Sequence, residues 1–231
     1  MTELLQRILP TVQKPARYTG GEYNEIQKNL DDVRVRVAFC FPDTYEIGMS
    51  HLGMKILYGL FNEREDIWCE RVFAVWPDME EEMRSAGMKL FALESGDAID
   101  QFDFIAFTLQ YELSYTNVLN MLDLAGIPLL SKDRGEGDPF VFMGGPCAYS
   151  AESIAPFADF FQLGEGEEMM NEIVDAYVLW KESGKDRIEY LKKIATIEGI
   201  YVPSFYRHEY NADGTLAAIV PLNGAPKAVT K

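Results

Sequence analysis

Three short segments of this sequence place glycine, hydroxyl, amide and carboxylate groups directly after apolar runs. They are Asp43 to Gly48, Thr108 to Gln110, and Gly144-Gly145. Glycine lets a ligand lie against the backbone, a hydroxyl hydrogen-bonds amide groups, and the amino end of a helix near Gly48 would face a phosphate. These residue types therefore predict the binding of a long, polar small molecule rather than bond-breaking chemistry.

The apolar runs before these segments predict the strands that must position them. The runs are 33–41, 104–109 and 140–143, and a fourth, 160–163, leads into Gly164-Glu165-Gly166. Continuous apolar strands that end in small or polar residues are typical of a parallel sheet with a ligand crevice along its carboxyl edge. We expect a doubly wound, mostly parallel α/β domain of flavodoxin-like type.

Hydrophobic spacing and turn signals predict the remaining elements. The expected helices cover 3–9, 48–61, 77–87, 114–125 (capped by Ser114), 165–181 and 185–197; further strands cover 68–75, 90–93 and 128–131; and a hairpin with an Asp-Gly turn covers 205–220. We divide the chain into an N-terminal arm (1–32), the α/β domain (33–184), and a C-terminal helix, β-hairpin and linker (185–231).

Composition excludes several classes of partner. The formal net charge of -16 repels phosphate backbones and anionic lipids, so we expect no direct nucleic-acid binding and no membrane binding. No signal peptide or long apolar segment is visible, and Cys40, Cys69 and Cys147 are scattered without metal-ligand spacing. We expect a cytoplasmic protein with free thiols and no metal site of its own.

The three polar segments follow the order of a known fingerprint. Cobalamin-binding domains of flavodoxin-like fold carry D-x-H-x-x-G, then S-x-L, then G-G, and this chain resembles them. Asp43 and Gly48 stand in their places, whereas Tyr45 replaces the histidine that ligates cobalt, Thr108 replaces the serine and Gln110 replaces the leucine. Tyr45 excludes ordinary histidine ligation at that position and leaves cobalamin binding open.

A longer stretch is similar to the N-terminal domain of cobalamin-dependent radical S-adenosylmethionine enzymes. It runs from Gly144-Gly145-Pro146 to Gly164-Glu165-Gly166-Glu167, and residues 14–24 further resemble one uncharacterised branch of that group. The resemblance implies cobalamin as the cofactor of this chain. It implies binding by Asp43, Tyr45, Gly48, Thr108, Gln110, Gly144, Gly145, Gly164, Glu165 and Gly166.

The same resemblance implies a partner. Radical enzymes of this type carry a C-terminal domain of the same polypeptide that holds a 4Fe-4S cluster and S-adenosylmethionine. The C-x-x-x-C-x-x-C motif of that domain is missing here, so we expect this chain to stop just before it.

Two hypotheses remain from the sequence. The chain lacks a phosphate-loop motif, a G-x-S-x-G elbow and an obvious general base, so we expect no catalytic residues in it and interpret it as a binding module. One hypothesis is the cobalamin-binding domain of a radical enzyme. The other is a cobalamin-free docking or substrate-recognition module of the same type of protein. His51 is interpreted as a surface residue of a helix.

Overall fold

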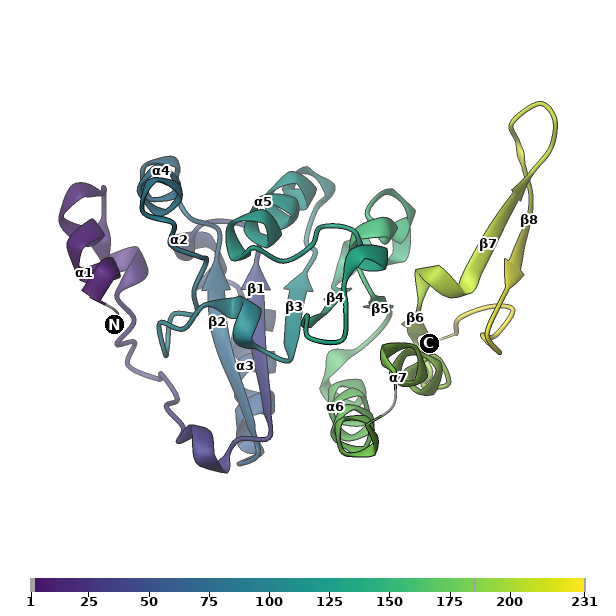
Figure 1. Cartoon of the computed structure of the whole chain (residues 1–231), viewed down its shortest axis with the longest axis horizontal. Coiled ribbons are helices and arrows are strands. Elements are labelled where there is room, and N and C mark those ends of the chain that lie inside the picture. The colour runs from purple at the N-terminus through teal and green to yellow at the C-terminus, as the bar shows by residue number, and fades with distance from the viewer. Residues whose placement is uncertain (1–2, 185, 231) are drawn as a thin grey trace.

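The chain folds around a single six-stranded sheet (Figure 1). The computed structural model describes residues 3–184 and 186–230. The sheet order is β2-β1-β3-β4-β5-β6; the first five strands are parallel, and β6 pairs antiparallel to β5. The strands are β1 (Val35–Phe41), β2 (Ile67–Phe73), β3 (Phe104–Thr108), β4 (Phe140–Gly144), β5 (Phe160–Gln162) and β6 (Ile200–Tyr201). This order confirms the flavodoxin-like α/β fold class.

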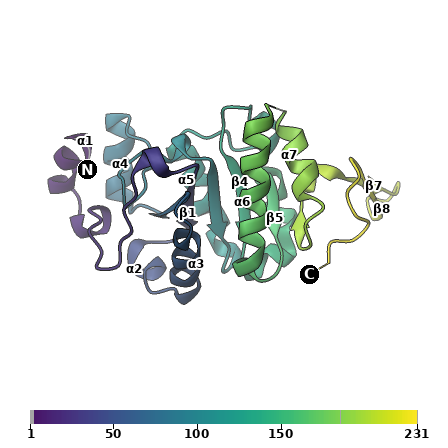
Figure 2. The ribbon, with the colours of Figure 1, turned by 90° about the horizontal axis from the view of Figure 1, so that it is seen from below.

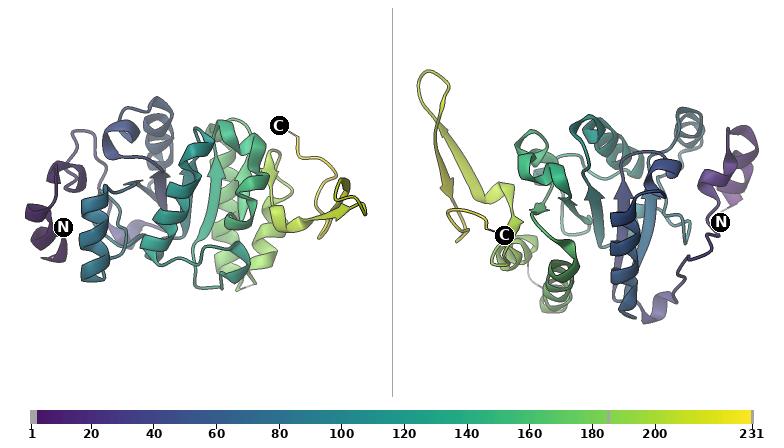
Figure 3. Two further views of the ribbon diagram at one scale, coloured as in Figure 1. Left: turned by 90° about the horizontal axis from the view of Figure 1, so that it is seen from above. Right: turned by 180° about the vertical axis from the view of Figure 1, so that it is seen from behind.

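Helices cover both faces of the sheet, which is why its strands are mostly apolar. In β1, Val37 and Phe39 pack on one face, and Ala38 and Cys40 pack on the other. One face carries α1 (Glu3–Ile8), α4 (Pro77–Ala86) and α5 (Tyr115–Ala125), and the other carries α3 (Leu52–Glu63), α6 (Gly166–Ser183) and α7 (Arg187–Ile194). Figure 2 shows α6 and α7 side by side, and Figure 3 shows the opposite face.

The structure corrects the predicted helix over 48–61. A short helix, α2 (Tyr45–Gly48), ends before His51, and α3 then begins at Leu52. The break arises because His51 leaves the helical region (φ -80°, ψ 117°) and caps α3 with its side chain. Ser114 precedes α5 as predicted but does not cap it, because its hydroxyl donates to the carbonyl of Tyr111.

Two predicted short strands do not form as strands. Residues 128–131 run into a 3₁₀ turn, because buried Arg134 donates to the carbonyls of Pro128 and Leu129 and so draws this segment around itself. Residues 90–93 make only one isolated bridge, between Phe91 and Ala98.

Beyond α7 the chain adds β6 to the sheet and then a hairpin of β7 (Tyr206–Tyr210) and β8 (Leu216–Pro221). The hairpin projects from the end of the molecule opposite α1 (Figure 1). Tyr190 and Ile194 of α7 are buried in the same core as Phe160 and Ile173, so this helix is part of the main body. None of the helices in the described residues has the length and apolar character needed to cross a membrane.

The N-terminal arm runs past the outer edge of β2 and ties down the connection after β1 (Figure 1). The indole of Trp68 donates to the carbonyl of Ile26 (3.0 Å), and the Ile26 amide donates to the Tyr58 hydroxyl (2.8 Å). Further along the arm, Arg17 donates to the Glu46 carboxylate of α2 (2.9 Å). The arm therefore fixes α2 from outside the sheet.

We expect Glu46 to titrate far below an ordinary glutamate. Hydrogen bonding from Arg17 lowers the pKa of Glu46 from 4.5 to about 2. Because the folded-state pKa is depressed, this contact stabilises the arm above pH 4.5 and is lost as the pH falls through about 2. Carboxyl-carbon NMR should show that midpoint, and Arg17→Gln should return it toward 4.5; a midpoint near 4.5 in both proteins would contradict the contact.

A buried ionic cluster fastens the opposite end of the sheet. Asp159 is 4% exposed and accepts hydrogen bonds from Arg134 (2.9 Å), Arg187 (3.1 Å) and the backbone amide of Val141 (2.7 Å). The guanidinium of Arg187 also lies over the ring of Phe140, 3.6 Å from its centroid. This cluster joins α7 and the loop before β4 to the sheet.

Candidate functional site

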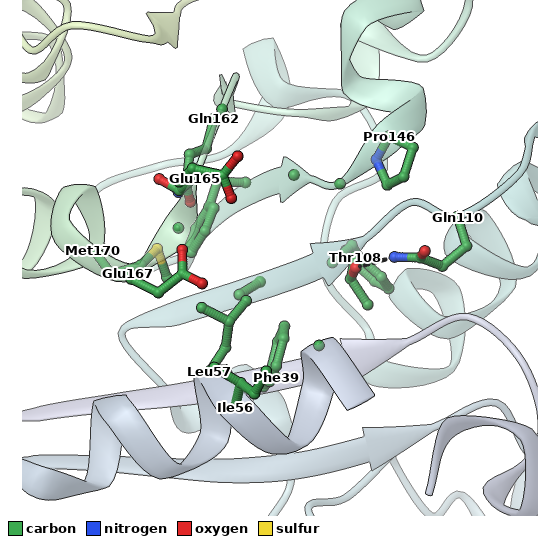
Figure 4. A pocket seen from close by; sticks show the side chains of 18 of the residues that line it. Phe39, Ile56, Leu57, Thr108, Gln110, Pro146, Gln162, Glu165, Glu167 and Met170 are labelled. Atoms are coloured by element: carbon green, nitrogen blue, oxygen red, sulfur yellow. Dashed lines mark hydrogen bonds between the residues drawn. The ribbon is translucent and has the colours of Figure 1, made fainter. Parts of the chain in front are cut away.

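A pocket of about 250 Å³ lies at the carboxyl edge of the sheet, between α3 and α6 (Figure 4). Apolar side chains form one wall, and Figure 4 shows Phe39, Ile56 and Leu57 together there. Polar groups lie around it, with Thr108 and Gln110 on one side and Gln162, Glu165 and Glu167 on another. A mostly apolar cavity with a few convergent polar groups is typical of a small-molecule site.

The structure brings seven of the ten predicted site residues to this pocket. They are Thr108, Gln110, Gly144, Gly145, Gly164, Glu165 and Gly166. The strand register explains the first four, because Thr108 pairs with Gly144 across adjacent parallel strands. The Gln110 side-chain amide donates to the Thr108 hydroxyl (2.7 Å), so both side chains are held at the strand end.

Gly145 adopts a backbone conformation that other residues strongly disfavour. Its φ is 95° and its ψ is -178°. An added Cβ would lie 2.8 Å from the Leu109 carbonyl oxygen and 3.2 Å from the Thr108 hydroxyl. The close approach lets the Leu109 amide donate to the Gly144 carbonyl (2.7 Å). Glycine at this position therefore shapes the pocket wall through the backbone.

The other three predicted residues lie at the same edge but outside the pocket lining. The Asp43 carboxylate accepts from the Tyr111 hydroxyl (2.6 Å), and Tyr45 donates to Glu22 of the arm. Burial, with Glu22 next, raises the pKa of Tyr45 to about 12. Gly48 is buried, and an added Cβ would lie 2.3 Å from Phe73.

The contacts of these three residues explain why they lie outside the pocket lining. The arm draws Tyr45 toward β2, and the break after α2 separates Gly48 from the pocket-lining helix. The helix that begins beside the pocket is therefore α3 and not the one near Gly48. That Asp43, Tyr45 and Gly48 contribute to ligand binding stays a prediction.

Among the pocket residues that were not predicted as site residues are His51 and Gln162. His51, interpreted there as a surface residue, is half-buried and lines the pocket at the start of α3. Gln162 ends β5, is buried, and donates to the Glu165 carbonyl (3.3 Å). The signal for Gln162 was available, since an amide at the end of an apolar run faces the same edge as Thr108. His51 carried no such signal once the helix was assumed to be continuous.

The pocket offers polar groups that can bind and orient part of a ligand. Its polar lining consists of a hydroxyl, two side-chain amides, two carboxylates and one imidazole. No cluster of three His, Cys, Asp or Glu side chains among the described residues is arranged to hold a metal ion. Its volume lies below the roughly 300–1,000 Å³ of ordinary ligand pockets, so a bulky ligand would insert only one part.

Comparison with known proteins places the chain. A model of the protein family described as "Radical SAM proteins, N-terminal" matches residues 53–203. The chain belongs to this family. The matched range of this radical SAM N-terminal domain includes all seven predicted residues that line the pocket, whereas Asp43, Tyr45 and Gly48 precede it.

One curated relative adds to this placement. The radical SAM N-terminal domain is 27% identical, over 184 residues, to an uncharacterized protein of Methanocaldococcus jannaschii. The match covers 73% of this chain and 34% of the relative, so the chain spans about a third of the length of the curated relative that it matches. No solved structure matches.

Proposed function

We propose that this domain is the cofactor-binding part of a radical SAM protein and that its pocket takes the nucleotide tail of a cobalamin. The observation that carries the proposal is the convergence of Thr108, Gly144-Gly145 and 164–166 on one cavity at the carboxyl edge. These are the positions of the S-x-L, G-G and G-E-G elements of the resemblance. The catalytic partner is then a C-terminal domain of the same polypeptide with a 4Fe-4S cluster and S-adenosylmethionine.

The residues of the pocket fit a tail rather than a corrin ring. A cavity of about 250 Å³ is too small to enclose a tetrapyrrole, but its glycine wall admits a slender group against the backbone. Thr108, Gln110 and Gln162 offer hydroxyl and amide groups to hold and orient it. Bound cobalamin would supply the cobalt chemistry, and this chain would supply binding and orientation.

The second candidate function is a cobalamin-free docking or substrate-recognition module. It is favoured by one observation: Tyr45, at the place of the cobalt-ligating histidine, is turned to Glu22 of the arm and does not line the pocket. In this alternative the same cavity holds part of a substrate.

Titration of the purified chain with hydroxocobalamin tests the proposal. We expect a shifted visible spectrum and stoichiometric retention on gel filtration. Gly144→Leu should weaken binding about tenfold or more, because the new side chain enters the cavity and overpacking typically costs about 1–3 kcal/mol. The matched control is Gly59→Leu, where an added Cβ would meet nothing within 4 Å. Absence of binding by the wild-type chain would favour the cobalamin-free module.

A further inference from the structure

His51 is the one imidazole of the pocket lining, and its position depends on the break between α2 and α3. Its backbone is extended at the N-cap of α3, and its ring lies 5.2 Å from that of Phe41. Nδ1 of the ring accepts a hydrogen bond from the Met54 backbone amide (3.1 Å). The side chain therefore caps the helix in the way that a serine or asparagine usually does.

This cap determines where the ring carries its proton. A backbone amide only donates, so Nδ1 must be the unprotonated nitrogen, and the neutral ring must carry its hydrogen on Nε2. Nε2 has no hydrogen-bond partner among the residues that the structure describes. The ring is thus held in one tautomer by the helix it caps, and His51 is among the residues that line the pocket.

We infer that His51 is a ligand-binding residue that offers its Nε2–H to the occupant of the pocket as a hydrogen-bond donor. The inference rests on the proposed function in taking this cavity as the ligand site. It assigns to His51 a role that differs from cobalt ligation, since a donor N–H has no lone pair to give. It also differs from general-base catalysis, because the basic nitrogen Nδ1 is already used by Met54.

The charges of the pocket indicate which acceptor this donor would meet. Glu165 and Glu167 line the same cavity, and carboxylates disfavour an anionic group close by. A neutral acceptor, such as a sugar hydroxyl oxygen, suits both the His51 donor and the carboxylates. We therefore expect a neutral oxygen of the nucleotide tail, and not its phosphate, to face His51.

Two substitutions separate the cap from the ligand contact. His51→Asn keeps an N-cap acceptor for the Met54 amide but removes the Nε2–H group, whereas His51→Ala removes both. We expect His51→Asn to melt like the wild type and to bind hydroxocobalamin about 5–10 times more weakly. His51→Ala should show the same loss of binding and also a melting temperature lower by about 2–4 °C.

Nitrogen-15 NMR of the imidazole in the intact chain supplies a readout that needs no ligand. In the neutral form of the ring we expect the proton on Nε2, and a neutral ring with its proton on Nδ1 would overturn the inference. Binding by His51→Asn equal to that of the wild type would overturn it as well. Failure of the wild-type chain to bind hydroxocobalamin would overturn the proposed function and, with it, the ligand assigned to His51, whereas a proton on Nδ1 would overturn the inference alone.

Discussion

Replacing Asp159 by alanine is expected to lower the free energy of unfolding by about 3–5 kcal/mol, a large part of the stability of a domain of this size. Both guanidinium partners of Asp159 are buried; the side chain of Arg134 is fully covered and that of Arg187 is 9% exposed. Without the carboxylate, two positive charges would face each other in the interior, and the Val141 amide would lose its acceptor.

Urea denaturation of the variant and the wild type measures this effect. The matched control is Glu182→Ala, which removes the partner of Arg34 in an ion pair whose side chains are 63% and 51% exposed. Because water replaces such a contact at little cost, the control should change the free energy of unfolding by no more than about 1 kcal/mol. A loss of unfolding free energy of similar size in both variants would contradict the prediction that the cluster at Asp159 stabilises the fold.

Replacing Gly145 by alanine should both destabilise the fold and remove ligand binding. The backbone angles at Gly145 are accessible to glycine almost alone, and an added Cβ would lie 2.8 Å and 3.0 Å from the Leu109 carbonyl oxygen and amide nitrogen. Relief requires the turn after β4 to move, and this turn forms a wall of the pocket. We expect a destabilisation of about 2–3 kcal/mol.

The hairpin offers a matched control for this substitution. Gly214 also has a positive φ, of 85°, but an added Cβ there would meet nothing within 4 Å. Gly214→Ala should therefore cost only about 1 kcal/mol of strain and leave binding of hydroxocobalamin intact. Thermal melting with a parallel titration of both variants checks this. Equal melting temperatures for the two variants would show that the close approach of an added Cβ to Leu109 does not destabilise the fold.

The core strands could be predicted because most of them are largely apolar runs that must be buried on both faces. The same pattern could not reveal β6, since a pair of residues, Ile200 and Tyr201, carries no periodicity and only its antiparallel pairing to β5 makes it a strand. The segment 128–131 has the composition of a strand but bends around Arg134, and that long-range contact is invisible in the local sequence.

The pocket shows the same division between local and long-range information. Thr108 and Gly144 could be placed together, because the ends of neighbouring parallel strands share an edge. The position of the Tyr45 side chain could not be predicted from the local sequence, because its hydrogen-bond partner Glu22 lies in the arm. His51 was missed because the helix it caps begins only after a break, and the run of apolar residues continues across that break.

Contacts from the loop before β3 cover the outer edge of β2, and they limit the pairing of this edge with strands of other proteins. The Arg71 amide of β2 donates to the Glu94 side chain (2.6 Å), and the Arg71 carbonyl accepts from the Leu93 amide (2.9 Å). The outermost parallel strand thus has its central hydrogen-bonding groups occupied from within the chain. Recruitment of a foreign strand is blocked on this flank, which guards the sheet against edge-to-edge aggregation.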